Sequence, residues 1–84
     1  LKLVHKSMDQ IRIVINGAGA AGIAIARLLR KAGAEKIWLC DSKGILSNSR
    51  TDLTEEKQEF AVKAQGTLAG AMQGADVFIG VSIP

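Results

Sequence analysis

Three runs of apolar residues divide the chain, and the longer segments between them carry apolar residues at helical spacing. The runs cover residues 11–16, 36–40 and 77–81, and each is bounded by polar residues or glycine. A strand of a parallel sheet is covered on both faces, so its residues are apolar without alternation. The pattern therefore predicts three buried, parallel strands.

The segment 20–31 is predicted to be the main helix. Its apolar residues recur at helical spacing at Ile23, Ala24, Ala26, Leu28 and Leu29. Arg27, Arg30 and Lys31 crowd its last turn, where cations complement the partial negative charge of a helix end. Gly33 follows and predicts where the helix stops.

A polar loop over residues 42–52 is predicted to lead into a second helix over residues 54–64. Thr51, Asp52 and Thr54 are the candidate caps for this helix, and acidic residues occupy its first turn. This arrangement is typical of a surface helix that follows a solvated loop.

A last short helix over residues 68–73, capped by Thr67 and ended by Gly74, completes the order β-α-β-α-α-β. Strands that alternate with helices form a parallel sheet with crossover helices. The predicted fold class is α/β: the first, mononucleotide-binding half of a Rossmann-type doubly wound parallel sheet, with three strands and crossover helices. We expect residues 1–84 to be part of a longer chain, because they begin without Met and end directly after an apolar run.

Composition and charge argue against several classes of partner. The net charge of +3 comes from scattered residues, without the basic stripe and exposed aromatic residues that bind nucleic acid. No apolar run approaches the roughly twenty residues needed to cross a bilayer. The single cysteine, Cys40, excludes an internal disulfide and any multi-cysteine metal site, which fits a reducing cytoplasm. We therefore expect a cytoplasmic protein with no nucleic-acid or membrane partner.

The main functional motif is the turn between the first strand and the main helix. It reads Gly17-Ala18-Gly19-Ala20-Ala21-Gly22. A helix start offers unpaired N–H groups and about half a positive charge, which suits a phosphate diester. In such a turn Gly17 lets the chain bend sharply, Gly19 lets the backbone approach a pyrophosphate, and Gly22 lets the helix pack against the strand. The six residues are predicted to bind the pyrophosphate of a dinucleotide cofactor.

A glycine motif also occurs in turns that bind nothing, so the residues around it matter. Asp41 ends the second strand, at the spacing expected for a carboxylate that binds the adenine ribose. A ribose-binding Asp41 favours NAD, because it repels the 2′-phosphate of NADP. Ser42 and Lys43 follow directly, and Arg50 and Lys57 bring further cations that could neutralise a 2′-phosphate. The choice between NAD and NADP therefore stays open.

The remaining chemistry-bearing residues add one candidate contact. Ser82 follows the third strand, at the sheet edge where α/β folds bind ligands, and is a candidate for cofactor binding. Cys40 is predicted to be a core thiol, and His5 has no partner nearby in the sequence for metal binding or catalysis. The glutamates of residues 54–64 fit a solvated helix face. No catalytic residue and no metal ligand is assigned to this chain.

Three stretches together resemble malic enzymes, in particular the compact bacterial and archaeal kind. They read VINGAGAAGIAIARLL, LCDSKGIL and GADVFIGVS, and the resemblance covers nearly the whole chain. The second and third are more specific than the glycine motif and separate this family from other Rossmann dehydrogenases. The stretch Ser47-Asn48-Ser49-Arg50 departs from the Gly-Arg pair often present in the family's loop.

The resemblance implies the NAD(P)-binding part of an enzyme that oxidatively decarboxylates (S)-malate to pyruvate and CO₂, with hydride transfer to NAD or NADP. It implies that the glycine turn binds the pyrophosphate, Asp41 the ribose, and Ser82 the central riboses or the nicotinamide end. Ser42, Lys43 and Lys57 are similar to residues of members that use NADP. The family's catalytic Tyr and Lys, and its carboxylates for Mn²⁺ or Mg²⁺, belong to an upstream domain, so this part alone is not expected to be active.

Two alternatives to a malic enzyme stay open. One is another NAD(P)-dependent oxidoreductase with a similar glycine turn. The other is a non-catalytic module that binds NAD(H), which the absence of an acid/base constellation also fits. For the full-length protein we expect malate as the substrate and a homo-oligomeric assembly.

Overall fold

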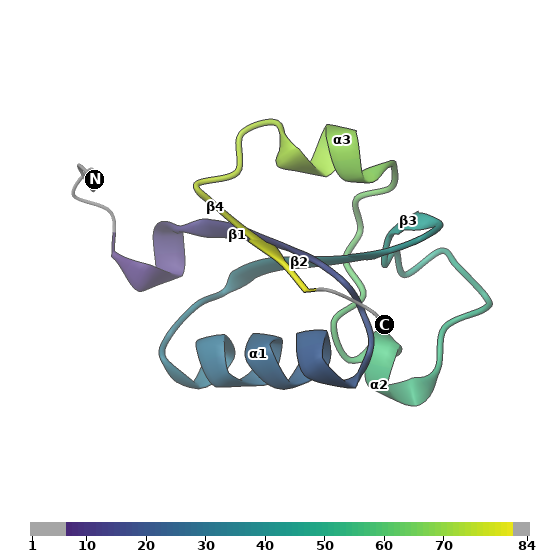
Figure 1. The fold of residues 1–84 in the computed structure, drawn as a ribbon, viewed down its shortest axis with the longest axis horizontal. Coiled ribbons are helices and arrows are strands. Elements are labelled where there is room, and N and C mark those ends of the chain that lie inside the picture. Colours follow the sequence, from purple (N-terminus) through teal and green to yellow (C-terminus); the bar gives the residue numbers. More distant parts are fainter. Residues whose placement is uncertain (1–6, 82–84) are drawn as a thin grey trace.

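A four-stranded sheet forms the centre of the molecule, and helices lie on both of its sides (Figure 1). The structure is a computed structural model that describes residues 7–81. In sheet order the strands are β3 (Gly44–Ile45), β2 (Lys36–Asp41), β1 (Arg12–Asn16) and β4 (Val77–Gly80). β1 pairs in parallel with β2 and β4, which confirms the three predicted strands to within one residue. β3 adds a short antiparallel strand beside β2, which the prediction of three parallel strands does not include.

The central strand β1 separates two apolar layers. Ile13 and Ile15 pack in the larger core against α1 (Ala20–Lys31), whereas Val14 packs on the other face near α3 (Leu68–Met72). All three side chains are at most 2% exposed. Because both faces of β1 are covered, its sequence is apolar without alternation, as predicted.

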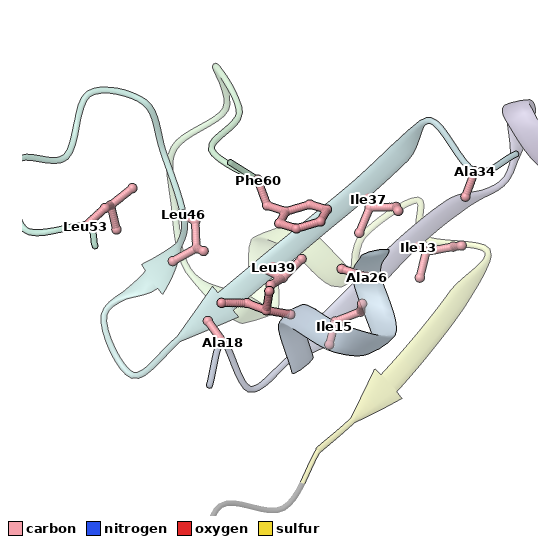
Figure 2. Packing of buried hydrophobic residues seen from close by; sticks show 11 residues of the cluster. Ile13, Ile15, Ala18, Ala26, Ala34, Ile37, Leu39, Leu46, Leu53 and Phe60 are labelled. Carbon is pink, nitrogen blue, oxygen red and sulfur yellow. The ribbon is translucent and has the colours of Figure 1, made fainter. Parts of the chain in front are cut away.

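Figure 2 shows the larger core, in which the ring of Phe60 lies beside Ile37 and Leu39 of β2. Leu46 and Leu53 extend the same cluster beyond the edge of the sheet, and both are buried. Residues from the segments on either side of α2 therefore complete a core that begins with β1 and α1. Burial of these aliphatic and aromatic side chains is the main stabilising contribution, at roughly 1.5–3 kcal/mol for each.

α1 begins and ends where the sequence predicts. Gly33, with a φ of +108°, follows the helix, and its N–H donates to the carbonyl of Arg30 at 3.0 Å. The N–H of Ala34 donates to the carbonyl of Leu29, also at 3.0 Å. This pair of bonds is a Schellman motif, which needs a residue in the left-handed region and so explains the glycine.

The outer surface of α1 differs from the prediction in two ways. Leu28, predicted to lie on the apolar face, is 69% exposed. Arg27 and Arg30 donate to the carboxylate of Glu59 at 2.8 and 2.9 Å. The cations predicted to complement the helix end thus also connect α1 to the residue that follows α2 (Glu55–Gln58).

The prediction of a helix over residues 54–64 is correct only for its first turn. Thr54 caps α2, and its hydroxyl accepts a backbone N–H of that helix at 3.3 Å. Beyond α2 the chain leaves the helical conformation, and Val62 forms a parallel bridge with Ser47. Backbone pairing with a distant segment therefore overrides the helix propensity of these residues.

The segment predicted as a polar loop, residues 42–52, contains β3 and a buried stretch. Leu46 and Ser47 are 0% and 2% exposed. The N–H of Leu46 donates to the carbonyl of Leu39 in β2, and the N–H of Ile45 donates to the carbonyl of Gly66, both at 2.9 Å. The segment pairs on both of its sides, which its short polar sequence does not indicate.

The last two elements lie close to their predicted bounds. Thr67 caps α3, and its hydroxyl accepts the N–H of Gly70 at 3.2 Å. Val77 and Phe78 of β4 are 36% and 45% exposed, so within residues 7–81 this strand is not covered on both faces as predicted. A short 3₁₀ turn before β1, Met8–Gln10, was not predicted.

Candidate functional site

A cleft of about 480 Å³ lies where the start of α1 meets the carboxyl end of β2. Its lining comprises Ala18, Gly19, Asp41, Ser42, Lys43, Asp52 and Lys57. The start of α1, α2 and β3 lie at the same end of the molecule in Figure 1. The carboxyl edge of a parallel sheet is where α/β folds bind their ligands. The fold thus brings the glycine turn and Asp41 to one cleft, as the sequence predicts.

The glycine turn connects β1 to α1 and packs tightly against the start of the helix. Gly17 has a φ of +128°, and its N–H donates to the carbonyl of Cys40 at 2.9 Å. A Cβ on Gly22 would lie 1.7 Å from the carbonyl oxygen of Gly17, which is an impossible contact. The conformational role of Gly17 and the packing role of Gly22 are therefore visible in the geometry.

Gly19 differs from these two glycines, because a Cβ at this position would meet nothing within 4 Å. It is the N-cap of α1, its backbone is extended, and no side chain accepts from the first turn there. The first N–H groups of a helix have no partner inside the helix. The N–H groups of Ala20 and Ala21 belong to the first turn of α1, and both residues are exposed. The start of α1 therefore offers donors and a partial positive charge to a ligand in the cleft.

The carboxylate of Asp41 is fully engaged by its neighbours. Its Oδ1 accepts the N–H of Lys43 at 2.9 Å and Nη1 of Arg50 at 3.0 Å. Its Oδ2 accepts Nη2 of Arg50 at 2.8 Å and Nζ of Lys57 at 3.5 Å. A carboxylate has about four acceptor positions, and these bonds use all of them. A ribose hydroxyl would have to replace one partner, and the long contact to Lys57 is the weakest.

Arg50 connects Asp41 to a second carboxylate, Asp52. Its Nε donates to Asp52 Oδ1 at 3.0 Å, and its Nη2 donates to Asp52 Oδ2 at 2.8 Å. Its Nη1 also donates to the carbonyl of Ile45 at 3.2 Å. With the two bonds to Asp41, these contacts use all five N–H donors of the guanidinium. The Arg50 side chain is 16% exposed, so this network is partly buried.

The charges of this network keep both carboxyls ionised. Hydrogen bonds from Arg50 lower the pKa of Asp41, with further help from the N–H of Lys43 and the charge of Lys57. Hydrogen bonds from Arg50 likewise hold the pKa of Asp52 well below its usual range. The two carboxylates face three cations, because Lys43 Nζ also lies 3.4 Å from Asp52. Asp41, Asp52, Arg50, Lys43 and Lys57 together form the charged rim, which has a net charge of +1, and all of them except Arg50 line the cleft.

The structure places most of the predicted site residues together. The exposed Ser42 lines the cleft, as do Lys43 and Lys57. Ala18 also lines the cleft and is 3% exposed. Ser82, the predicted contact after the third strand, lies outside the described residues. The roles of all these residues toward a cofactor stay predictions.

Sequence reasoning missed how Arg50 and Asp52 act. The sequence predicts Arg50 only as a cation for a phosphate, and Asp52 only as a helix cap. Of the candidate caps, Thr54 alone is the N-cap, whereas Asp52 binds Arg50 and Lys43. An arginine two residues from an aspartate and nine from another is the signal that could have indicated a shared guanidinium.

Outside the cleft, the described residues offer little further chemistry. Cys40 is buried, as predicted, and burial raises the pKa of its thiol, with a smaller contribution from the charge of Asp41. Within residues 7–81 no group of three His, Cys, Asp or Glu side chains could hold a metal ion. In the same range, no helix is both long enough and apolar enough to span a membrane.

A parallel β-α-β unit with a glycine turn at a helix start and an acidic residue after the next strand defines a dinucleotide-binding half-domain. The family described as "Malic enzyme, NAD binding domain" matches residues 1–79. The chain belongs to this family.

Curated relatives agree with this assignment. The chain is 46% identical over 89 residues to the bifunctional malic/malolactic enzyme of Bacillus subtilis, with 99% of the chain and 22% of the relative covered. It is 45% identical to the NADP-dependent malic enzyme of Halomonas elongata, with 100% and 21% covered. It is 39% identical to the NAD-dependent malic enzyme of Geobacillus stearothermophilus, with 100% and 19% covered. The chain spans about a fifth of the length of these relatives.

Solved structures show the same fold. The crystal structure of the NAD-dependent malic enzyme from Thermotoga maritima superposes with a TM-score of 0.82 at 35% identity, over 93% of this chain and 22% of that one. The malic enzyme of Entamoeba histolytica superposes with a TM-score of 0.81 at 37% identity, over 94% of this chain and 18% of that one. The predicted α/β fold is thus confirmed, and it is compatible with one half of a Rossmann-type domain.

Proposed function

We propose that this chain is the cofactor-binding part of an NAD(P)-dependent malic enzyme, which oxidatively decarboxylates (S)-malate to pyruvate and CO₂. The observation that carries the proposal is the cleft between Gly19 and Asp41. It joins uncapped N–H donors of α1 to a charged rim at the end of β2. Membership of the malic enzyme family supports the proposed reaction, and the geometry of the cleft supports the proposed binding site.

The pyrophosphate is proposed to lie against the start of α1, because the space beside Gly19 is open. There the first N–H groups of the helix donate to phosphate oxygens, and the helix dipole favours their negative charge. A side chain at this position would extend into the open space and displace the phosphates. The chain's own contribution is therefore to bind and orient the cofactor, which supplies the hydride acceptor.

The adenine ribose is proposed to lie beside Asp41, where one hydroxyl replaces the 3.5 Å contact to Lys57. Lys57 would then be free to turn toward a 2′-phosphate. Relatives named NAD-dependent and NADP-dependent both match the chain, which fits a rim that carries both carboxylates and cations. We propose binding of both cofactors, with the 2′ position decided by the charged rim.

Catalysis would require groups beyond those of the described residues 7–81. A divalent metal such as Mn²⁺ or Mg²⁺ is proposed to be held by residues elsewhere in the full-length protein, because no suitable cluster exists within residues 7–81. The same proposal includes malate as the substrate, a homo-oligomeric assembly and no nucleic-acid partner. A cytoplasmic location is part of it, supported by the unpaired, buried thiol of Cys40.

The test is a malate turnover assay on the full-length protein, with NAD and NADP in parallel and with or without Mn²⁺. We expect pyruvate and reduced cofactor in a metal-dependent reaction. Calorimetry with each cofactor in the absence of malate measures binding separately from turnover. Binding without turnover would instead support the non-catalytic NAD(H)-binding module, and absence of binding would contradict the cleft assignment.

A further inference from the structure

The arrangement around Arg50 in the charged rim goes beyond what the proposed function describes. Arg50 presents two edges of its guanidinium, and a carboxylate occupies each of them. Asp41 takes the edge formed by Nη1 and Nη2, at 3.0 and 2.8 Å. Asp52 takes the edge formed by Nε and Nη2, at 3.0 and 2.8 Å. Planar two-point contacts of this kind are also how arginine binds phosphate.

The two carboxylates differ in burial and in their partners. The Asp41 side chain is 14% exposed and ends a strand, with Lys43 N–H and Lys57 as additional partners. The Asp52 side chain is 41% exposed and lies in a segment without helix or strand structure. Asp52 also accepts from Lys43 Nζ at 3.4 Å. A single, more exposed carboxylate thus engages two of the three cations at the rim.

We propose that Asp52 acts as an internal substitute for the cofactor's 2′-phosphate and determines the preference between NAD and NADP. This inference rests on the proposed function. While Asp52 is bound, no N–H donor of Arg50 is free. A 2′-phosphate must therefore displace Asp52 to reach this guanidinium edge, and it meets the negative charge of the displaced carboxylate nearby. NAD has hydroxyls at this place and needs no such displacement.

The consequence is a selective effect on affinity. Asp52 lowers the affinity for a 2′-phosphorylated dinucleotide and leaves the affinity for NAD nearly unchanged. Replacing its charge by a neutral amide weakens the hold on both Arg50 and Lys43, and raises the net charge of the rim by one. The lowered pKa of Asp52 is consistent with a carboxylate that stays ionised and paired at neutral pH.

The experiment compares dissociation constants for NADP and NAD in the full-length protein and in Asp52→Asn, by calorimetry at fixed ionic strength. We expect the ratio of NADP affinity to NAD affinity to rise about tenfold, which corresponds to about 1.4 kcal/mol. Glu35→Gln is the matched control. It removes the same charge from an exposed position directly before β2, at the opposite end of that strand from Asp41.

Each outcome decides the question. A rise of the ratio in Asp52→Asn, with none in Glu35→Gln, supports the proposal. An unchanged ratio with both cofactors bound overturns it and leaves the proposed function intact. If neither cofactor binds the unmodified protein, the proposed function fails as well. Asp52→Ser is a second variant for the case in which Asp52→Asn misfolds, because it removes the same charge with a different side chain. An NAD affinity retained by either variant shows that the cleft is formed.

Discussion

The glycine turn and the charged rim face the same cleft but are built in different ways. The turn, from Gly17 to Gly22, depends on backbone groups and on glycines that have no side chain. The rim works through long charged side chains that come from separate segments and hold one another. The turn therefore suits what all dinucleotides share, a pyrophosphate, whereas the rim suits the part in which they differ.

This contrast implies different responses to substitution. A change in the turn is steric, and its effect is large and insensitive to salt. A change in the rim redistributes charge, and its effect is smaller and depends on ionic strength. Substitutions in each region therefore test this contrast.

Gly22→Val should disrupt both fold and binding. A Cβ at this position lies 1.7 Å from the Gly17 carbonyl oxygen, so α1 must move away from β1. We expect the free energy of unfolding of the full-length protein to fall by about 3 kcal/mol or more, with loss of cofactor binding. Thermal and denaturant unfolding measure the first effect, and calorimetry measures the second. Unchanged stability would mean that α1 does not pack against the turn as described.

Gly19→Val should weaken cofactor binding strongly and leave folding nearly unchanged. The Gly19 backbone is extended, and its Cβ would enter open space, so no strain is expected. We expect NAD and NADP to bind about a hundredfold more weakly, a loss of about 2.7 kcal/mol, because the side chain fills the pyrophosphate position. The unfolding transition should stay close to that of the unmodified protein. Retained affinity for both cofactors would refute the placement of the pyrophosphate.

Arg50→Lys should weaken the rim while keeping its charge. Lysine cannot make two two-point contacts at once, so Asp41 and Asp52 lose most of their shared partner. We expect the free energy of unfolding to fall by about 1–2 kcal/mol, because hydrogen bonds to charged groups contribute at this level. Arg27→Lys is the control, since its 51% exposed side chain forms one surface ion pair, with Glu59, and such pairs contribute little to stability. Equal losses for the two variants would show that the rim is no more than a surface ion pair.

Acid should weaken the rim progressively. The pKa of Asp41 is lowered in the folded protein, chiefly by hydrogen bonds from Arg50. Its ionised form therefore stabilises the fold fully above the ordinary Asp pKa of about 3.9, and this contribution disappears as the pH falls through the lowered pKa. Unfolding free energies measured between pH 7 and pH 3 should fall below about pH 4. Asp41→Asn should show a shallower fall over that range.

The structure of the segment from Ser42 to Asp52 could not be predicted from the sequence. Its polar composition indicates a solvated loop, yet Leu46 and Ser47 are buried and β3 pairs with β2. The helix predicted to continue to residue 64 is likewise cut short where Val62 pairs with Ser47. In both cases the partner lies far away in the sequence, so local periodicity carries no signal for the pairing.

What the sequence determined by itself is the local part of the molecule: three parallel strands, the limits of α1 and the glycine turn. Each of these depends on neighbouring residues, because apolar runs, capping and the lack of a Cβ act within a few positions. Only the tertiary structure decided that one guanidinium, Arg50, lies between Asp41 and Asp52. That arrangement depends on how the chain after β2 folds back, which is set by burial of Leu46 and Leu53 and by backbone pairing across the molecule.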